Sequence, residues 1–581
     1  MIRKLARSIR EYWKATLLTP LFVCFEVVLE VIIPLLMANL IDYGIDAGNM
    51  NYVGKMGGAL LVAAFFSLTF GVLAGRTAAK ASAGFAKNLR QDMFYKVQGF
   101  SFANIDKFST ASIITRLTTD VTNIQNAFQM LTRMAIRSPM MLVFSLTVSI
   151  SIDAKLSLIF LGSIPVLGVG LWLIMRNAHP IFTRVFRTYD KLNNVVQENL
   201  RGIRVVKSFV REDYETRKFT GISGEIYKDF TKAERLLVFN APLMQFCMYV
   251  CILLISWFGA RAIVASGGDP AVGLSTGELL SLITYALQIL ISLMMLSMVF
   301  VMLTISRASA TRIVEILDEE SSLKNSPNPV YEVPNGDITF ENVSFSYSAG
   351  ADKPVLENIN LEIKSGETVG IIGGTGSSKS TLVQLIPRLY DVTQGSVKVG
   401  GIDVRDYDLE TLRDEVAMVL QKNVLFTGTI KENLRWGNEK ATEEEMIHAC
   451  KLAHAHEFIE TFAEKYDTFI EQGGVNLSGG QKQRLCIARA LLKKPKILIL
   501  DDSTSAVDMK TDAQIRKALR EEIPDTTKLI IAQRVASVQD ADKIIVLDEG
   551  KISAIGNHEE LLHSSAIYRE VYESQAKGGD E

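Results

Sequence analysis

Six long apolar stretches in the first half of the chain limit most strongly what this sequence can fold into. A helix needs about 20 mostly apolar residues to cross the roughly 30 Å hydrocarbon core of a bilayer. Each stretch is approximately long enough for one crossing, so we predict six membrane-spanning helices. The predicted spans are Leu17–Ile41, Met56–Ala74, Met134–Ser151, Leu156–Met175, Leu237–Ala265 and Leu279–Ile305.

Basic residues are concentrated in the two long segments that join spans two to three and four to five, whereas the short links are poor in Lys and Arg. Because the loops on the cytoplasmic side of a membrane carry an excess of Lys and Arg, we expect both termini and both long segments in the cytoplasm. The long segments keep helical patterning, which predicts that spans two to five continue as helices beyond the membrane. The first stretch is too long for a signal peptide and lacks a cleavage site, so we interpret it as a retained span.

Glu26 and Glu30 lie one helical turn apart inside the first predicted span. An uncompensated acid in the middle of a bilayer costs on the order of a few kcal/mol, so both should face the bundle interior or a water-filled cavity. Two interpretations stay open. Either the pair lines a path for cationic or polar substrates, or neighbouring helices supply its partners.

The composition narrows the class of protein further. The 581-residue chain is too long for one core, and its positive mean hydropathy coexists with 22% charged residues, which is typical of a membrane half joined to a soluble half. A formal net charge of −2 gives no indication of a nucleic-acid partner. The five scattered cysteines are interpreted as packing thiols without a disulfide framework.

A glycine-rich loop lies between a predicted strand and a predicted helix in the second half. Its glycines let backbone N–H groups turn inward around a polyphosphate, Lys379 can reach the β- and γ-phosphates, and the Ser380 hydroxyl can bind Mg²⁺. The helix N-terminus that follows favours negative charge. Ser378 stands where this loop pattern has glycine. The residues expected to bind the nucleotide phosphates are Gly373, Gly374, Thr375, Gly376, Ser377, Ser378, Lys379, Ser380 and Thr381.

Two further stretches of the second half carry chemistry. Lys496–Leu500 is a short, mostly apolar strand that leads to Asp501, as expected for a buried parallel strand that brings a carboxylate to Mg²⁺. Asn476–Gln481 is rich in glycine and precedes a predicted helix at Lys482–Leu492, which makes a second potential anion site. A stretch with three prolines, Ser321–Asn335, reads as a linker.

Taken together, these motifs resemble those of the ATP-binding cassette (ABC) exporter family over essentially the whole chain. The most specific part is Leu477, Ser478, Gly479, Gly480 and Gln481, followed by the strand that ends at Asp501. The resemblance implies a half-transporter: an all-α six-helix transmembrane domain at 1–320, a linker at 321–336 and an α/β P-loop nucleotide-binding domain at 337–581. It also implies ATP and Mg²⁺ as cofactors and a multi-pass protein of the plasma (inner) membrane.

The family implies a role for several single residues. Tyr347 matches the aromatic residue that stacks on adenine, and Gln421 matches a residue that contacts Mg²⁺ and senses the membrane domain. Asp508 lies in the loop that crosses between two cassettes. Leu477–Gln481 would act on the ATP that the phosphate loop of a second chain holds. The Mg²⁺ ligands would be Ser380, Gln421 and Asp501.

Two positions depart from the family pattern at the step of hydrolysis. The usual glutamate after the Mg²⁺ aspartate is Asp502, and the usual histidine is Gln533. Aspartate is one methylene shorter, and a misplacement of about 1 Å can cost roughly a hundredfold in rate. Glutamine keeps its hydrogen bonds but cannot become a cation as imidazole does. The chain therefore resembles the degenerate-site subunit of a prokaryotic heterodimeric multidrug exporter, whose partner half-transporter supplies the glutamate and the histidine.

Alternatives remain for the function. The six spans exclude a soluble cassette protein, and the fusion of both parts in one chain argues against an importer. An ATP-gated channel or a regulatory ABC subunit stays open, as does the export of lipids or peptides rather than drugs. The sixth span is rich in methionine, which would suit an adaptable pocket for amphipathic small molecules, although such methionines more often serve packing.

Overall fold

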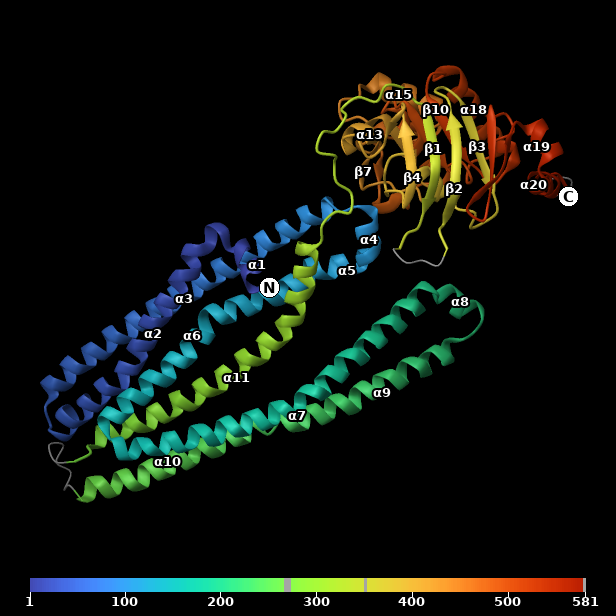
Figure 1. The fold of residues 1–581 in the computed structure, drawn as a ribbon. Coiled ribbons are helices and arrows are strands. Elements are labelled where there is room, and N and C mark those ends of the chain that lie inside the picture. The colour runs from blue at the N-terminus through green and yellow to red at the C-terminus, as the bar shows by residue number, and fades with distance from the viewer. Residues whose placement is uncertain (266–272, 349–352, 578–581) are drawn as a thin grey trace. The chain divides into compact units, whose positions relative to one another are not determined.

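The computed structural model describes residues 1–265, 273–348 and 353–577, which form two compact units (Figure 1). The first unit holds Met1–Gln98 and Thr110–Glu319, and the second holds Gly99–Ser109 and Glu320–Glu581. The segment Gly99–Ser109 therefore packs with the second unit, although the sequence-based division places it in the membrane domain.

The described part of the first unit contains six helical segments that are long and apolar enough to cross a membrane, which confirms the six predicted spans. Two of these helices, α3 and α7, have 49 and 48 residues and run well past the apolar stretches, as the patterning predicts. In Figure 1, α7 and α9 lie along each other and are joined by the short helix α8. The spans lie in α2 (Trp13–Leu40), α3 (Met50–Gln98), α6 (Val121–Ile152), α7 (Ala154–Arg201), α10 (Asn240–Ala265) and α11 (Thr276–Asp318). Shorter or more polar helices are α1 (Ile2–Ala6), α5 (Thr110–Thr115), α8 (Ile203–Ser208) and α9 (Glu212–Leu237).

Apolar packing between helices holds the first unit together. One core joins α2, α6 and α11, where the buried Tyr285 hydroxyl donates a hydrogen bond to the Val31 carbonyl oxygen at 2.6 Å. A second core joins α7, α10 and α11 and buries Cys247 and Cys251. All five cysteines are free, so these two thiols serve packing, as predicted.

Glu26 and Glu30 of α2 share one partner, Arg137 of α6. The two Nη atoms of Arg137 bind one acid each, and its Nη2 lies 2.8 Å from both carboxylate oxygens of Glu30. The Glu26 side chain is 8% exposed, and its Oε2 is buried without a hydrogen-bond partner. The structure thus favours the second interpretation of the acidic pair, in which a neighbouring helix supplies the partner.

Replacing Arg137 with alanine leaves two acids without their cation inside the helix bundle. Breaking a buried ion pair in this way costs about 3 to 5 kcal/mol, so we expect the free energy of unfolding in detergent to fall by about that amount. Arg184→Ala is the matched control, because Arg184 pairs with Asp229 while 58% of its side chain is exposed, and it should cost less than about 1 kcal/mol. Equal losses for the two variants would contradict the assignment of a buried triad.

The second unit is built on two sheets. A six-stranded sheet has the order β12-β11-β3-β10-β9-β6, in which only β12 runs antiparallel to its neighbour. Its strands are β3 (Thr368–Gly373), β6 (Val416–Val419), β9 (Ile497–Asp501), β10 (Thr527–Ile531), β11 (Lys543–Asp548) and β12 (Lys551–Gly556). An antiparallel sheet of order β2-β1-β4-β5 joins β1 (Ile338–Phe345), β2 (Leu356–Ile363), β4 (Gln394–Val399) and β5 (Ile402–Asp403). The α/β fold class is therefore confirmed.

Strand β1 carries a local irregularity but runs as one strand from Ile338 to Phe345. Asn342 has a positive φ of 49°, and the register with β2 shifts between Phe340 and Val343. A bulge of this kind leaves the pairing intact on both sides of the irregular residue.

Helices complete the second unit. The principal ones for function are α12 (Lys379–Gln384), α17 (Gly479–Leu491), α18 (Met509–Glu522) and α20 (Ala566–Lys577). The others are α4 (Phe102–Phe108), α13 (Leu409–Glu415), α14 (Ile430–Arg435), α15 (Glu443–Leu452), α16 (His456–Ile459) and α19 (His558–Ser564), and a small ladder joins β7 (Gly428–Thr429) to β8 (Phe469–Ile470). Buried side chains of β3, β9 and β10 contribute to the apolar cores that hold the sheet and helices together.

Candidate nucleotide site

The predicted phosphate loop connects the carboxyl end of β3 to the start of α12. Strand β3 lies inside the sheet between β11 and β10, so the loop projects from the middle of a rigid layer. Gly376 has a φ of +86°, which glycine adopts without strain. Ser378 has a φ of +72° and a left-handed conformation, although its side chain makes no capping hydrogen bond with α12. Ser378 thus has a backbone conformation that glycine would adopt without strain.

Lys379 holds the phosphate loop closed around its own ammonium group. Its Nζ donates to the carbonyl oxygens of Gly373 at 2.8 Å and Gly374 at 2.9 Å, and to Ser377 Oγ at 3.3 Å. Burial lowers the pKa of Lys379, and the nearby carboxylates of Asp501 and Asp502 oppose that shift. A cation is thus held inside a loop of backbone groups, which is the arrangement that a polyphosphate requires.

Two of the three predicted Mg²⁺ ligands, Ser380 and Asp501, meet directly. Ser380 Oγ donates to Asp501 Oδ1 at 2.9 Å, and burial raises the pKa of Asp501. Hydroxyl and carboxylate oxygens are suitable ligands for Mg²⁺, which usually takes one or two carboxylates together with phosphate oxygens of its nucleotide. Across residues 1–265, 273–348 and 353–577, no cluster of three or more His, Cys, Asp or Glu side chains forms a denser metal site.

Asp502 and Gln533 are brought together by the pairing of β9 with β10. Asp501 lies opposite Ile531 in the parallel ladder, so the residues just past each strand end are neighbours. Gln533 Nε2 donates to Asp502 Oδ2 at 2.9 Å. Burial raises the pKa of Asp502, and hydrogen bonds from Gln421 and Gln533 partly offset that rise. The Gln533 amide therefore engages the aspartate, and the predicted degenerate positions contact one another.

Tyr347 lies beside the start of α12. Its hydroxyl shares a hydrogen bond of 2.9 Å with Thr381 Oγ1, and its ring is 49% exposed. An exposed aromatic face next to the phosphate loop is suited to stacking on a nucleobase. Tyr390 supports it from one side, with the two rings edge to face and their centroids 5.2 Å apart. No local pattern indicates Tyr390, which lies 43 positions after Tyr347 in the chain.

Tyr390 also binds the helix α4. Its hydroxyl donates to Asp106 Oδ2 at 2.8 Å, and its ring packs near Phe102 with centroids 6.1 Å apart. Burial and the Asp106 carboxylate raise the pKa of Tyr390, so the phenol stays protonated and able to donate. A segment that lies between spans two and three in the sequence is thereby connected to the aromatic residue of the site.

The second glycine-rich motif forms the N-terminus of α17. Ser478 caps the helix: its Oγ accepts from the Gln481 N–H at 3.3 Å, and the Gln481 side chain accepts from the Ser478 N–H at 2.9 Å. Leu477 is buried, whereas Ser478 and Gly479 are exposed. Among the described residues, no hydrogen bond or ion pair joins this motif to the phosphate loop of the same chain. An exposed helix N-terminus of this kind can accept an anion from another molecule.

A buried glutamine that the sequence analysis missed ties this motif to the segment after Asp502. Gln483 Oε1 accepts from the Ala506 N–H at 2.9 Å, and its Nε2 donates to Ser505 Oγ at 3.2 Å. A side chain at Gly480 would place its Cβ 2.9 Å from the Ala506 carbonyl oxygen, which explains the glycine there. Asp508 then caps α18 by accepting from the Thr511 N–H at 2.9 Å.

The strained backbone at Ser378 yields a prediction. A left-handed conformation costs a residue with a Cβ about 1 to 2 kcal/mol, a cost that glycine does not have. Glycine loses more backbone entropy on folding than serine does, which offsets about 0.5 to 1 kcal/mol of that advantage. Ser378→Gly should therefore raise the free energy of unfolding of the cassette by about 0.5 kcal/mol or more, as measured by denaturant titration of the purified chain. Ser377→Gly is the control: Ser377 is buried, accepts from Lys379 and has no positive φ, so its loss should destabilise. A destabilised Ser378→Gly variant would refute the assigned strain.

Comparison with known proteins agrees with the geometry. Residues 16–294 match the family model of the ABC transporter transmembrane region, and residues 356–505 match that of the ABC transporter cassette. The uncharacterized ABC transporter ATP-binding protein YfiB of Bacillus subtilis is 38% identical, over 95% of this chain and 94% of its own length. An ATP-dependent lipid A-core flippase of Desulfotalea psychrophila is 33% identical, over 84% of each chain. A fatty acid ABC transporter ATP-binding/permease protein of Mycobacterium bovis is 33% identical, over 83% of this chain and 75% of its own.

The fold has a counterpart among solved structures. A bacterial Atm1-family ABC exporter with ATP bound superposes with a TM-score of 0.81 and 24% sequence identity, over 98% of this chain and 99% of that one. The matching structure thus has the folds of both halves of this chain, in the same order. The chain belongs to the ABC transporter family, as a multi-pass membrane protein with a transmembrane domain and an ATP-binding cassette in one polypeptide.

Proposed function

We propose that this chain is one half of a heterodimeric ABC exporter and that its own nucleotide site retains ATP but hydrolyses it poorly. The observation that carries the proposal is the hydrogen bond from Gln533 Nε2 to Asp502 Oδ2. It occupies one oxygen of the carboxylate that would have to polarise the attacking water.

The chemistry at both positions disfavours turnover. The shorter side chain of Asp502 sets its carboxylate back by about 1 Å, which corresponds to roughly a hundredfold in rate or about 2.7 kcal/mol in the barrier. Gln533 can donate a hydrogen bond to a phosphate but cannot carry a positive charge or exchange a proton. The binding parts, by contrast, are complete: Lys379 sits in the loop, and Ser380 meets Asp501.

The intact second motif supports a heterodimer. Ser478 and Gly479 are exposed at the N-terminus of α17, ready to meet a phosphate held by another chain. Two copies of this chain would form two impaired sites. A partner half-transporter with glutamate and histidine at the corresponding positions would give one competent site, which Leu477–Gln481 of this chain would complete. ATP turnover by the pair would drive transport across the plasma membrane, with both termini and the cassette on the cytoplasmic side.

The proposed substrates are hydrophobic or amphipathic compounds, drug-like or lipid-like. Two relatives with about one third identity are named for lipids, a lipid A-core flippase and a fatty acid transporter. The charged groups Glu26, Glu30 and Arg137 are paired with one another, so the apolar faces of the spans are left to recognise a substrate. A channel or a purely regulatory subunit would show no net flux against a gradient in vesicles, whereas an exporter would.

Purification of the chain alone tests the heterodimer. We expect full-length protein in lipid nanodiscs to bind ATP but to release phosphate at a rate near background, because both sites of a homodimer would lack the glutamate and the histidine. Addition of a partner half-transporter that has both residues should restore turnover. Robust ATP hydrolysis by the isolated chain would refute the proposal.

The double variant Asp502→Glu with Gln533→His tests the cause of the low turnover. With the hydrolytic glutamate of the partner replaced by glutamine, hydrolysis at this chain's site should rise on the order of tenfold to a hundredfold, since a displaced carboxylate accounts for roughly a hundredfold. Each single substitution is measured alongside. No gain in the double variant would place the limit elsewhere in the site, at Ser378 or in the partner's glycine-rich motif.

A further inference from the structure

The C-terminal helix α20 contacts the backbone that follows Gln533. The side chain of Gln575 makes two hydrogen bonds there: its Oε1 accepts from the Val535 N–H at 2.8 Å, and its Nε2 donates to the Gln533 carbonyl oxygen at 2.8 Å. One amide side chain thus uses both of its ends on two backbone groups that flank Arg534. We call this pair of bonds the Gln575 clip.

The Gln575 clip supplies a hydrogen-bond acceptor that the backbone after Gln533 lacks locally. A 3₁₀ turn begins at Val535, and the first N–H of a helical turn has no partner within it. Arg534, at the capping position, makes no side-chain capping bond. Gln575 provides the missing acceptor from a helix 40 residues further along the chain. The conformation of the turn after Gln533 therefore depends on the C-terminal helix.

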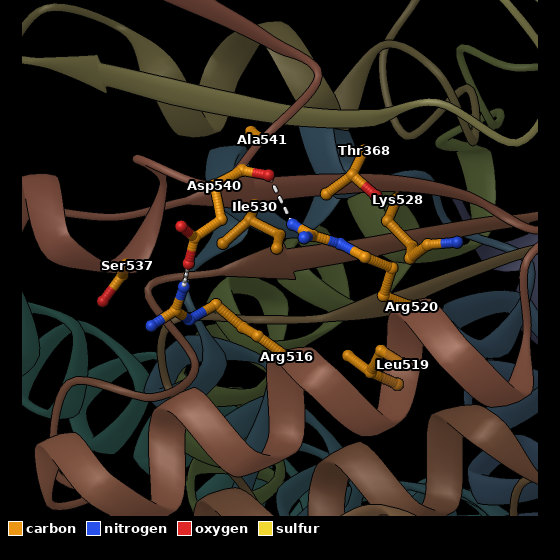
Figure 2. Close-up of a pocket in the computed structure, with 9 residues that line it drawn as sticks. All are labelled: Thr368, Arg516, Leu519, Arg520, Lys528, Ile530, Ser537, Asp540 and Ala541. Atoms are coloured by element: carbon orange, nitrogen blue, oxygen red, sulfur yellow. Dashed lines mark hydrogen bonds and ion pairs between the residues drawn. The ribbon is translucent and has the colours of Figure 1, made fainter. Parts of the chain in front are cut away.

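The other end of the same loop is held by α18 (Figure 2). Ser537 Oγ donates to Asp512 Oδ2 at 3.0 Å. Arg516 pairs with Asp540 at 3.0 Å. Arg520 donates to the Asp540 carbonyl oxygen. The hollow between these groups measures about 10 Å³, which is room for one water molecule at most, so the charges anchor the loop rather than bind a ligand.

We propose that Gln575 is a positioning residue for this chain's nucleotide site: by fixing the backbone of Gln533, it keeps the Gln533 amide on Asp502 and so lengthens the time for which ATP is retained. The inference rests on the proposed function, in which this site binds ATP without rapid hydrolysis. The contacts run from the Gln575 Nε2 to the Gln533 carbonyl and from the Gln533 Nε2 to Asp502, at 2.8 and 2.9 Å. With α18 holding residues 537–540, loss of the clip frees the end of the loop nearer the nucleotide.

Dissociation of a fluorescent N-methylanthraniloyl ATP with Mg²⁺ from the full-length chain in nanodiscs tests this role. Gln575→Ala should release the nucleotide about fivefold faster, the equivalent of about 1 kcal/mol for one net hydrogen bond. Gln575→Glu keeps the acceptor for the Val535 N–H but sets a carboxylate oxygen against the Gln533 carbonyl oxygen in place of the donor, so it should release the nucleotide at least as fast as Gln575→Ala. Glu573→Ala, an exposed residue of the same helix, is the control and should match wild type.

A double-mutant cycle separates positioning from mere stabilisation. Gln533→Ala keeps the carbonyl that Gln575 binds but removes the amide on Asp502. If Gln575 acts through that amide, Gln575→Ala has no further effect in the Gln533→Ala background. The same fivefold increase in both backgrounds, or no increase in either, would overturn the inference. If wild type itself failed to bind the nucleotide or hydrolysed it rapidly, the proposed function would fall instead.

Discussion

The parallel pairing of β3, β10 and β9 places the central groups of the nucleotide site. Side by side, these strands end at one edge of the sheet, so the phosphate loop, Gln533 and the two adjacent aspartates project from the same side. The strands are buried throughout their length, and their mutual register is fixed by backbone hydrogen bonds. A shift of one residue between β9 and β10 would separate Asp502 from Gln533 and exchange apolar side chains between the two cores on either side of the sheet.

Charged groups are held in different ways in the two units. In the first unit, one guanidinium binds two carboxylates, which leaves Glu26 Oε2 without a hydrogen bond in a buried position. In the second unit, Asp501 and Asp502 are adjacent acids whose pKa values are both raised by burial, and Lys379 lies close enough to oppose the rise. A site with two poorly compensated carboxylates favours a divalent cation, so the same burial that raises these pKa values prepares the site for Mg²⁺.

Sequence reasoning found the parts of the site that are local in the chain. Short sequence patterns predict the glycine-rich loop, Ser380 and Asp501. A loop that wraps a phosphate needs consecutive residues, and a short apolar strand predicts the position of the acid that follows it. Tyr390, Gln483 and Gln575 could not be found in this way. Each acts through a contact with residues 22 to 43 positions away, and only tertiary packing decides which polar side chain reaches which backbone group. The same holds for Arg137, which lies 107 residues after Glu30.

In the proposed heterodimer, hydrogen bonds behind Asp502 would let this chain's nucleotide site influence the site that it completes on its partner. Ser505 Oγ donates to the Asp502 carbonyl oxygen at 3.0 Å and accepts from Gln483, which lies in the helix that begins with the exposed glycine-rich motif. A change in the backbone at Asp502, where φ is +49°, would therefore reach the N-terminus of α17 through two hydrogen bonds. Because a non-glycine residue in that conformation is strained, the surrounding bonds must hold it in place. Gln533 does so at the side chain and Ile531 at the N–H. Under the proposed function, Asp502 would therefore be a rigid connection between this chain's nucleotide site and the glycine-rich motif that meets the partner's nucleotide.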